Sequence, residues 1–387
     1  MPSPTGAGRL PSLTGLRFLL AACVLAAHTF SGSMLFGAEL QTALSSAAVP
    51  LATCPVSGFF VLSGFVLAWS HRPEDRAGAF WRRRFWRIYP NHALGWTLGA
   101  LFYVFTTAPS PMAAGGSATT LGGTAELLLV KVWVPAREVF NGFNDPSWSV
   151  CCEAFFYLLF PWLISAVRSL SRSGLRRAWL LLACVILALP SVALALGGPP
   201  LPGWPLGVRS VWFAYVFPPA RLPEFVLGIV TARLVREGHW PRLNAPTRAG
   251  AFAVGLAATP FLPLTYCLGT TSSVPFSLVI AGLAVRDVHG RGRLLARPAA
   301  VALGEASYAL YITHFPLLMS VRQAVGVHHR FSAPNGVLFA LGSMAAAQTV
   351  ALIVHRRCER PVQACLAEGR RRRRVGRPLR AHHGAGT

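Results

Sequence analysis

Apolar stretches of about twenty residues recur along this chain, and they limit its fold more than any other feature. A transmembrane helix needs about 17 to 25 mostly apolar residues, and segmentation on that basis gives about ten spans. They cover roughly residues 13–31, 50–70, 91–108, 148–167, 178–196, 219–235, 249–266, 272–286, 301–322 and 336–355. The sequence therefore predicts an all-α, polytopic integral membrane protein.

Composition supports this prediction and excludes other classes of protein. The 387 residues are 53% hydrophobic and only 13% charged, which is too apolar for an ordinary cytosolic domain. The formal net charge of +23 is typical of a nucleic-acid binder, but such a protein would not carry repeated membrane-length apolar stretches. The expected partner is the lipid bilayer and not nucleic acid. Cysteine and histidine spacings predict no metal site.

The distribution of basic residues predicts how the spans are oriented. Of the 36 basic residues, 29 fall in alternate connections, beginning with the N-terminal one. The positive-inside rule then places both termini in the cytoplasm, with the protein in the cell (plasma) membrane. Residues 1–361 are expected to form one transmembrane domain, and 362–387 a basic, disordered cytoplasmic tail near anionic headgroups. The longest connection, about 109–147, is expected to form a cover at the outer face.

Arg17 and His28 are ionisable residues inside the first span, where such groups are costly and often functional. Eleven residues separate them, so they share one helix face at a separation of about 16 Å. Arg17 lies toward the predicted inner surface and His28 toward the outer one. The alternatives are that Arg17 extends to lipid headgroups and that His28 is a hydrogen-bonded packing residue.

Glu153 begins the fourth span just under the predicted outer interface, at a depth similar to that of His28. A carboxylate near an imidazole fixes its tautomer and favours its protonated form, as a general base requires. The sequence thus allows a His28–Glu153 contact, and the alternative is a purely structural buried pair. Glu224, Glu305 and Glu359 lie near helix ends beside arginines and are weaker candidates.

A basic segment laced with aromatic residues enters the third span from the predicted inner side. Its arginines are Arg82, Arg83, Arg84 and Arg87. Arginine binds phosphate through two parallel hydrogen bonds, so a phosphate clamp is one interpretation. An interfacial anchor is the other.

Seven motifs together resemble the acyltransferase 3 family, in order along nearly the whole chain. They are Leu13 to Arg17 with His28, Gly58 to Phe65, Arg82 to Pro90, Trp148 to Pro161, Arg221 to Phe225, Ser307 to Tyr311 with His314, and Glu359 to Pro361. Two positions depart from the family pattern: Thr14 replaces the usual Asp, and Ala154 replaces a second acidic residue that often follows the Glu.

The resemblance implies a multi-pass enzyme that moves an acyl group from cytoplasmic acyl-CoA to an acceptor hydroxyl. His28 would be the essential base and Glu153 would orient it or stabilise its imidazolium. Arg17 and the four clustered arginines would bind the acyl-CoA phosphates. Ser149, Tyr308, Tyr311 and His314 are expected as acceptor or oxyanion contacts. Acyl-CoA would be a co-substrate, and no permanently bound cofactor is expected.

Three kinds of function remain open at this stage. The chain resembles compact family members that O-acylate macrolide antibiotics, which favours transfer of an acetyl or propionyl group to a macrolide-type hydroxyl. O-acetylation of cell-surface polysaccharide or glycolipid sugars is an alternative acyl transfer. A multi-pass transporter or flippase with intramembrane His and Glu is the alternative from another class, although no internal repeat supports it. A homodimer also remains open.

Overall fold

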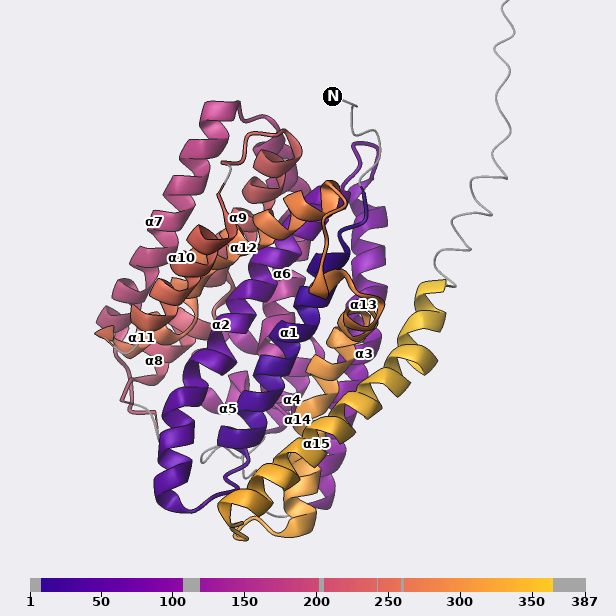
Figure 1. Ribbon diagram of the computed structural model, residues 1–387. Coiled ribbons are helices and arrows are strands. Elements are labelled where there is room, and N and C mark those ends of the chain that lie inside the picture. The colour runs from indigo at the N-terminus through magenta and orange to yellow at the C-terminus, as the bar shows by residue number, and fades with distance from the viewer. Residues whose placement is uncertain (1–7, 107–118, 202–204, 242, 259–260, 365–387) are drawn as a thin grey trace, which may run out of the picture.

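The computed structural model describes residues 8–106, 119–201, 205–241, 243–258 and 261–364. Within these ranges the chain forms helices joined by short helical turns and loops, and no β-strand. Figure 1 shows long helices lying side by side, tilted against one another, with the shorter ones filling the ends of the bundle. This all-helical architecture confirms the all-α part of the predicted fold class.

The long helices match most of the predicted spans. They are α1 (Pro11–Ala27), α2 (Ala38–Ser70), α3 (Ala77–Phe105), α6 (Trp148–Arg168), α7 (Arg172–Leu196), α9 (Pro218–Arg236), α10 (Ala245–Ala258), α12 (Thr270–Val288), α14 (Ser307–Val325) and α15 (Ala333–Val354). The shorter elements are η1 (His28–Gly32), α4 (Thr120–Leu127), η2 (Lys131–Trp133), α5 (Arg137–Phe140), η3 (Asp145–Ser147), α8 (Val208–Val211), η4 (Trp212–Val216), α11 (Leu264–Cys267), η6 (Leu294–Ala296), α13 (Pro298–Glu305) and η7 (His355–Glu359).

Seven helical segments in the described part of the chain are long and apolar enough to cross a membrane. The predicted spans at 91–108, 249–266 and 301–322 are not among them. Helix α3 starts well before its predicted span and includes the arginine cluster, and α10 has only 14 residues. The predicted span at 301–322 is divided at Ala306 into α13 and α14. The number of ten spans therefore stays a prediction.

The start of α1 and the end of η7 both lie in the upper half of Figure 1. Which side of a membrane they face stays a prediction from the charge distribution. Residues 107–118 of the predicted cover and 365–387 of the predicted tail lie outside the described residues.

The centre of the bundle is built on close helix contacts at glycines. Gly64 of α2 faces the Phe225 carbonyl of α9, and Gly228 of α9 faces the Val61 carbonyl of α2, with no room for a Cβ atom at either position. Gly15 of α1 packs in the same way against the backbone of η6. These contacts explain on packing grounds two glycine-containing motifs noted in the sequence. Helices α7 and α15 lie outside this centre and expose most of their residues.

The described part of the predicted cover is held by the chain's single lysine, which is completely buried. The Lys131 ammonium donates to the Asn141 and Asn144 carbonyls at 2.7 and 2.9 Å and lies 3.6 Å from the Glu126 carboxylate. A buried ion pair is stable only when hydrogen bonds satisfy its remaining donors and acceptors. Glu126 meets this condition by accepting from the backbone N–H groups of Phe143 and Asn144.

A hydrogen bond to a carbonyl that Pro316 leaves without a helical partner joins the cover to α14. Pro316 lacks a backbone N–H, so the carbonyl of Ile312, four residues earlier, loses its helical partner. The side-chain amide of Asn144 donates to this carbonyl at 2.9 Å. The bond fixes residues 144–147, at the start of α6, against the middle of α14.

Candidate active site

His28 lies where the first helix changes its geometry. Helix α1 passes directly into the π-helical turn η1, whose first residue is His28. The His28 carbonyl accepts from both the backbone N–H and the side-chain hydroxyl of Ser33, at 3.1 and 3.2 Å. Single π-helical turns of this kind occur frequently at functional sites. The turn leaves the imidazole half-buried, at the wall of a cavity.

The partner of His28 is His314 on α14. Nδ1 of His28 lies 2.9 Å from Nε2 of His314, with the ring centroids 5.1 Å apart and the ring planes 13° apart, so the two imidazoles meet edge to edge. Phe315 packs edge-on against the His28 ring at a centroid distance of 5.7 Å. His314 is 1% exposed, so this pair is held rigidly on its α14 side.

The contact between His28 and Glu153 that the sequence allowed does not form. Ser149 of α6 hydrogen-bonds to Tyr311, one turn before His314 on α14. Glu153 lies a further turn along α6 in the opposite direction, which separates the levels of Glu153 and His28 by roughly 10 Å. Glu153 and Arg17 instead line the same two cavities, without a direct ion pair between them.

Three adjoining cavities connect the level of Arg17 with that of His28. An inner cavity of about 400 Å³ contains Arg17 and Glu153, and a narrow middle cavity of about 50 Å³ shares both residues with it. The middle cavity shares Val56 and Tyr311 with an outer cavity of about 250 Å³, which contains His28. The shared walls form a chain of cavities through the bundle, narrowest in the middle.

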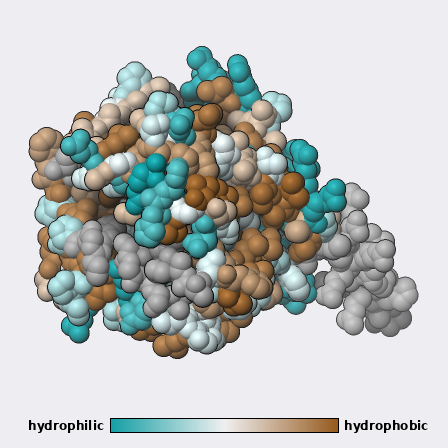
Figure 2. Space-filling view, turned by 90° about the horizontal axis from the view of Figure 1, so that it is seen from below, coloured by the Kyte–Doolittle hydropathy of each residue, from teal (hydrophilic) through white to brown (hydrophobic). Residues whose placement is uncertain are grey.

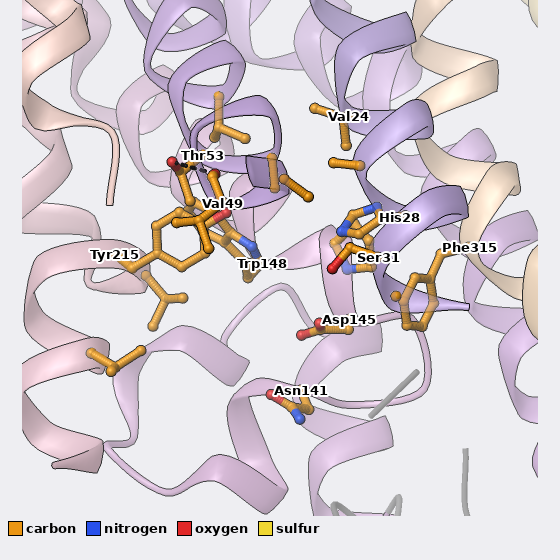
Figure 3. Close-up of a pocket in the computed structure, with 18 of the residues that line it drawn as sticks. Val24, His28, Ser31, Val49, Thr53, Asn141, Asp145, Trp148, Tyr215 and Phe315 are labelled. Carbon is orange, nitrogen blue, oxygen red and sulfur yellow. Dashed lines mark hydrogen bonds between the residues drawn. The ribbon is translucent and has the colours of Figure 1, made fainter. Parts of the chain in front are cut away.

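The outer cavity combines an apolar wall with a few polar groups. Val24, Val49, Trp148 and Phe315 contribute to the apolar wall. Figure 3 shows Ser31, Asp145 and Asn141 around the same cavity as His28. The lower end of the bundle, where η1 lies, mixes hydrophilic with hydrophobic residues in Figure 2.

The inner cavity is strongly cationic. Arg9, Arg17, Arg84 and Arg87 line it, against the single acid Glu153. Among the described residues none of these four guanidinium groups hydrogen-bonds or pairs with another side chain or carbonyl. The Arg84 guanidinium only lies over the rings of Phe80 and Tyr157, at 5.6 and 5.9 Å. Cations without protein acceptors in a cavity are suited to an anionic ligand.

Only half of the predicted arginine cluster faces this cavity. Arg84 and Arg87 are three residues apart and therefore share a face of α3. Arg82 is exposed, and Arg83 forms an ion pair with Asp75 at 3.2 Å. The interfacial role is thus open to Arg82 and Arg83, whereas Arg84 and Arg87 belong to the cavity.

The hydroxyl groups expected as oxyanion donors already have protein partners. Tyr308 donates to the Ile88 carbonyl at 2.9 Å, and Tyr311 donates to the Pro146 carbonyl at 3.1 Å. Ser149 shares a 2.8 Å hydrogen bond with Tyr311. In the structure these groups hold α3, α6 and α14 together around the cavities.

Sequence reasoning missed Asp145, which lines the same outer cavity as His28 (Figure 3). It was counted with the cover, although its position just before the fourth span offered a signal. Ser63 and Tyr157, which hydrogen-bond to each other at 2.9 Å in the inner cavity wall, were also missed as site residues. In the described ranges no group of three His, Cys, Asp or Glu side chains is arranged to hold a metal ion.

Comparison with known proteins identifies the family. The family model described as "Acyltransferase domain" matches residues 10–356. An acyltransferase named MdmB, from Streptomyces mycarofaciens, is 36% identical over 373 residues, which is 94% of each chain. No solved structure matches the chain. The family match includes all the residues that line the three cavities except Gly8 and Arg9, and together with the relative it shows that this chain belongs to the acyltransferase 3 family.

Proposed function

We propose that this protein is a plasma-membrane O-acyltransferase that uses acyl-CoA as donor and a macrolide-type hydroxyl as acceptor. The observation that carries the proposal is the chain of cavities, with unpaired arginines at one end and His28 at the other. Family membership supports acyl transfer in general, and the two ends of the chain of cavities support the choice of donor and base.

The inner cavity supports acyl-CoA as the donor. Its four arginines have no acceptor among the described residues and are suited to the phosphates of CoA, because guanidinium groups bind phosphate through charge-assisted hydrogen bonds. The acyl-bearing arm of CoA would then cover the roughly 16 Å rise from Arg17 to His28. The small volume of the middle cavity, about 50 Å³, supports a slender arm with a short acyl group, acetyl or propionyl, as the part of the donor that would pass it.

His28 would act as the general base at the outer end. Its Nε2 atom accepts the proton of the acceptor hydroxyl as the hydroxyl oxygen attacks the thioester carbonyl carbon. The C–S bond then breaks, and the CoA thiolate takes up the proton from His28. General-base catalysis of this kind contributes roughly 10²- to 10⁴-fold in rate.

The outer cavity supports an acceptor with an apolar body and a hydroxyl group. Its wall is mostly apolar and aromatic, with polar groups near His28 that can orient a hydroxyl. A macrolide has this character, as the resemblance to compact macrolide O-acyltransferases also suggests. A cell-surface sugar is more polar throughout and would leave much of this wall without a complementary surface.

The proposal is tested by incubating purified protein with acetyl-CoA or propionyl-CoA and a panel of acceptors, followed by mass spectrometry of the products. The panel contains macrolide lactones, their glycosides and free sugars. An increase in acceptor mass by one acyl group, with macrolides preferred, is expected. Acylation of sugars alone would transfer the assignment to polysaccharide or glycolipid, and no product from any pair would contradict the proposal.

A further inference from the structure

The hydrogen bonds of His314 determine which of its ring nitrogens carries a proton. Its Nδ1 atom lies 3.1 Å from the Leu310 carbonyl and 2.8 Å from the Tyr311 carbonyl. A carbonyl can only accept, so Nδ1 of His314 must be the protonated nitrogen. In the neutral ring Nε2 is then an acceptor, and this is the atom that faces His28.

The same reasoning determines the protonated ring nitrogen of His28. Because Nε2 of His314 accepts, the His28 Nδ1 atom at 2.9 Å must donate. Neutral His28 therefore carries its proton on Nδ1 and has a lone pair on Nε2. No described residue hydrogen-bonds to Nε2 of His28, and the side chain lines the outer cavity.

We infer that His314 is a positioning residue that holds His28 in the Nδ1–H tautomer and so directs the basic Nε2 atom to the acceptor hydroxyl. The inference rests on the proposed function of His28 as general base. In this inference His314 orients His28 in place of Glu153, whose level along the bundle is roughly 10 Å from that of His28. His314 then does not contact the acceptor directly.

The surroundings of His314 fit a positioning role better than they fit direct contact with a substrate. His314 is 1% exposed, and it is absent from the walls of all three cavities. The hydrogen bond to His314 and the T-shaped contact with Phe315, at a centroid distance of 5.7 Å, restrict the His28 ring further. A base held by a third group in this way matches the general pattern of an oriented catalytic imidazole.

Two substitutions separate positioning from other roles. Gln at position 314 can offer its side-chain carbonyl to Nδ1–H of His28, whereas Leu offers no acceptor. We expect His314→Leu to lower kcat about 10²-fold, within the roughly 10²- to 10⁴-fold that a general base provides. His314→Gln should recover most of that loss, and KM for acyl-CoA should stay unchanged in both. Equal loss in both variants would overturn the inference, because a passive acceptor would then not suffice.

A measurement without turnover keeps this inference separate from the proposed function. ¹⁵N spectra of histidine-labelled protein in detergent report the tautomer of neutral His28, assigned by comparison with His28→Ala. Nδ1–H is expected in the wild type, with a mixture or a reversal in His314→Leu. Nε2–H in the wild type would refute the inference even if acyl transfer is found. Absence of acyl transfer with Nδ1–H present would count against the proposed function alone.

His92 provides a matched control for loss of a buried imidazole. It is also 1% exposed, but it bonds to the Glu126 carbonyl and lines none of the three cavities. His92→Gln should leave the His28 tautomer unchanged. A change as large as that in His314→Leu would show a general effect of packing and contradict a specific part for His314.

Discussion

Replacing Arg84 and Arg87 by alanine should weaken acyl-CoA binding and spare the chemical step. Both guanidinium groups line the inner cavity, and neither has a hydrogen-bond acceptor in the described protein. A hydrogen bond to a charged group contributes about 1.5–3 kcal/mol. Two such groups would contribute about 3–6 kcal/mol, which is roughly 10²- to 10⁴-fold in affinity. Arg9 and Arg17 remain in the variant, so the lower end of this range is expected.

The assay is steady-state thiol release at varied acyl-CoA concentration. KM for acyl-CoA should rise about 10²-fold with little change in kcat, because the lost contacts bind ground state and transition state alike. The matched control is Arg82→Ala with Arg83→Ala, which removes the same charge from positions of α3 that do not line the inner cavity. Equal effects of the two double variants would refute a specific phosphate site.

A truncated donor sharpens this test. An acyl-pantetheine thioester has the reactive arm but no phosphates, so the wild type and the Arg84/Arg87 variant should use it equally poorly. The difference between donors isolates the interaction between arginine and phosphate, as in a double-mutant cycle. A persisting difference of 10²-fold with acyl-pantetheine would place the effect on the fold of α3 instead.

Three further substitutions test other parts of the structure. Glu153→Gln should change KM for acyl-CoA more than the rate of a single turnover, since Glu153 shares its cavities with Arg17 and not with His28; a selective loss of single-turnover rate would contradict this. Lys131→Met should lower the free energy of unfolding by about 3–5 kcal/mol by leaving Glu126 buried and unpaired, and thermal unfolding with and without Glu126→Gln checks this. Gly64→Ala should cost about 1–3 kcal/mol by separating α2 from α9, and unchanged thermal unfolding would argue against that close contact.

The helices and the two ends of the site could be predicted from local pattern. Hydrophobic stretches predicted most of the long helices, and the spacing of eleven positions predicted that Arg17 and His28 share one helix. Helical periodicity also groups Arg84 with Arg87. Periodicity does not show which face of α3 points inward, because that depends on the helices that pack against it. For this reason the sequence could not separate Arg84 and Arg87, which line the inner cavity, from Arg82 and Arg83, which do not.

Contacts between distant segments could not be predicted in the same way. His28 and His314 are 286 positions apart, and nothing in either local sequence specifies their meeting. The depth of Glu153 was misjudged because the start of a span was taken as the membrane surface. In the structure the cover encloses that start, and Trp148 is buried there at 5% exposure. The two histidines therefore meet at a level that Glu153 does not reach.

The most direct test of the account is acceptor-dependent thiol release from acetyl- and propionyl-CoA, with wild type compared to His28→Ala. The variant should remain folded and bind acyl-CoA through the inner arginines, which makes it a test of chemistry alone. Release that requires an acceptor is expected in the wild type, and this release should be lost in His28→Ala. Wild-type turnover by a folded His28→Ala protein would contradict the assignment of His28 as the base.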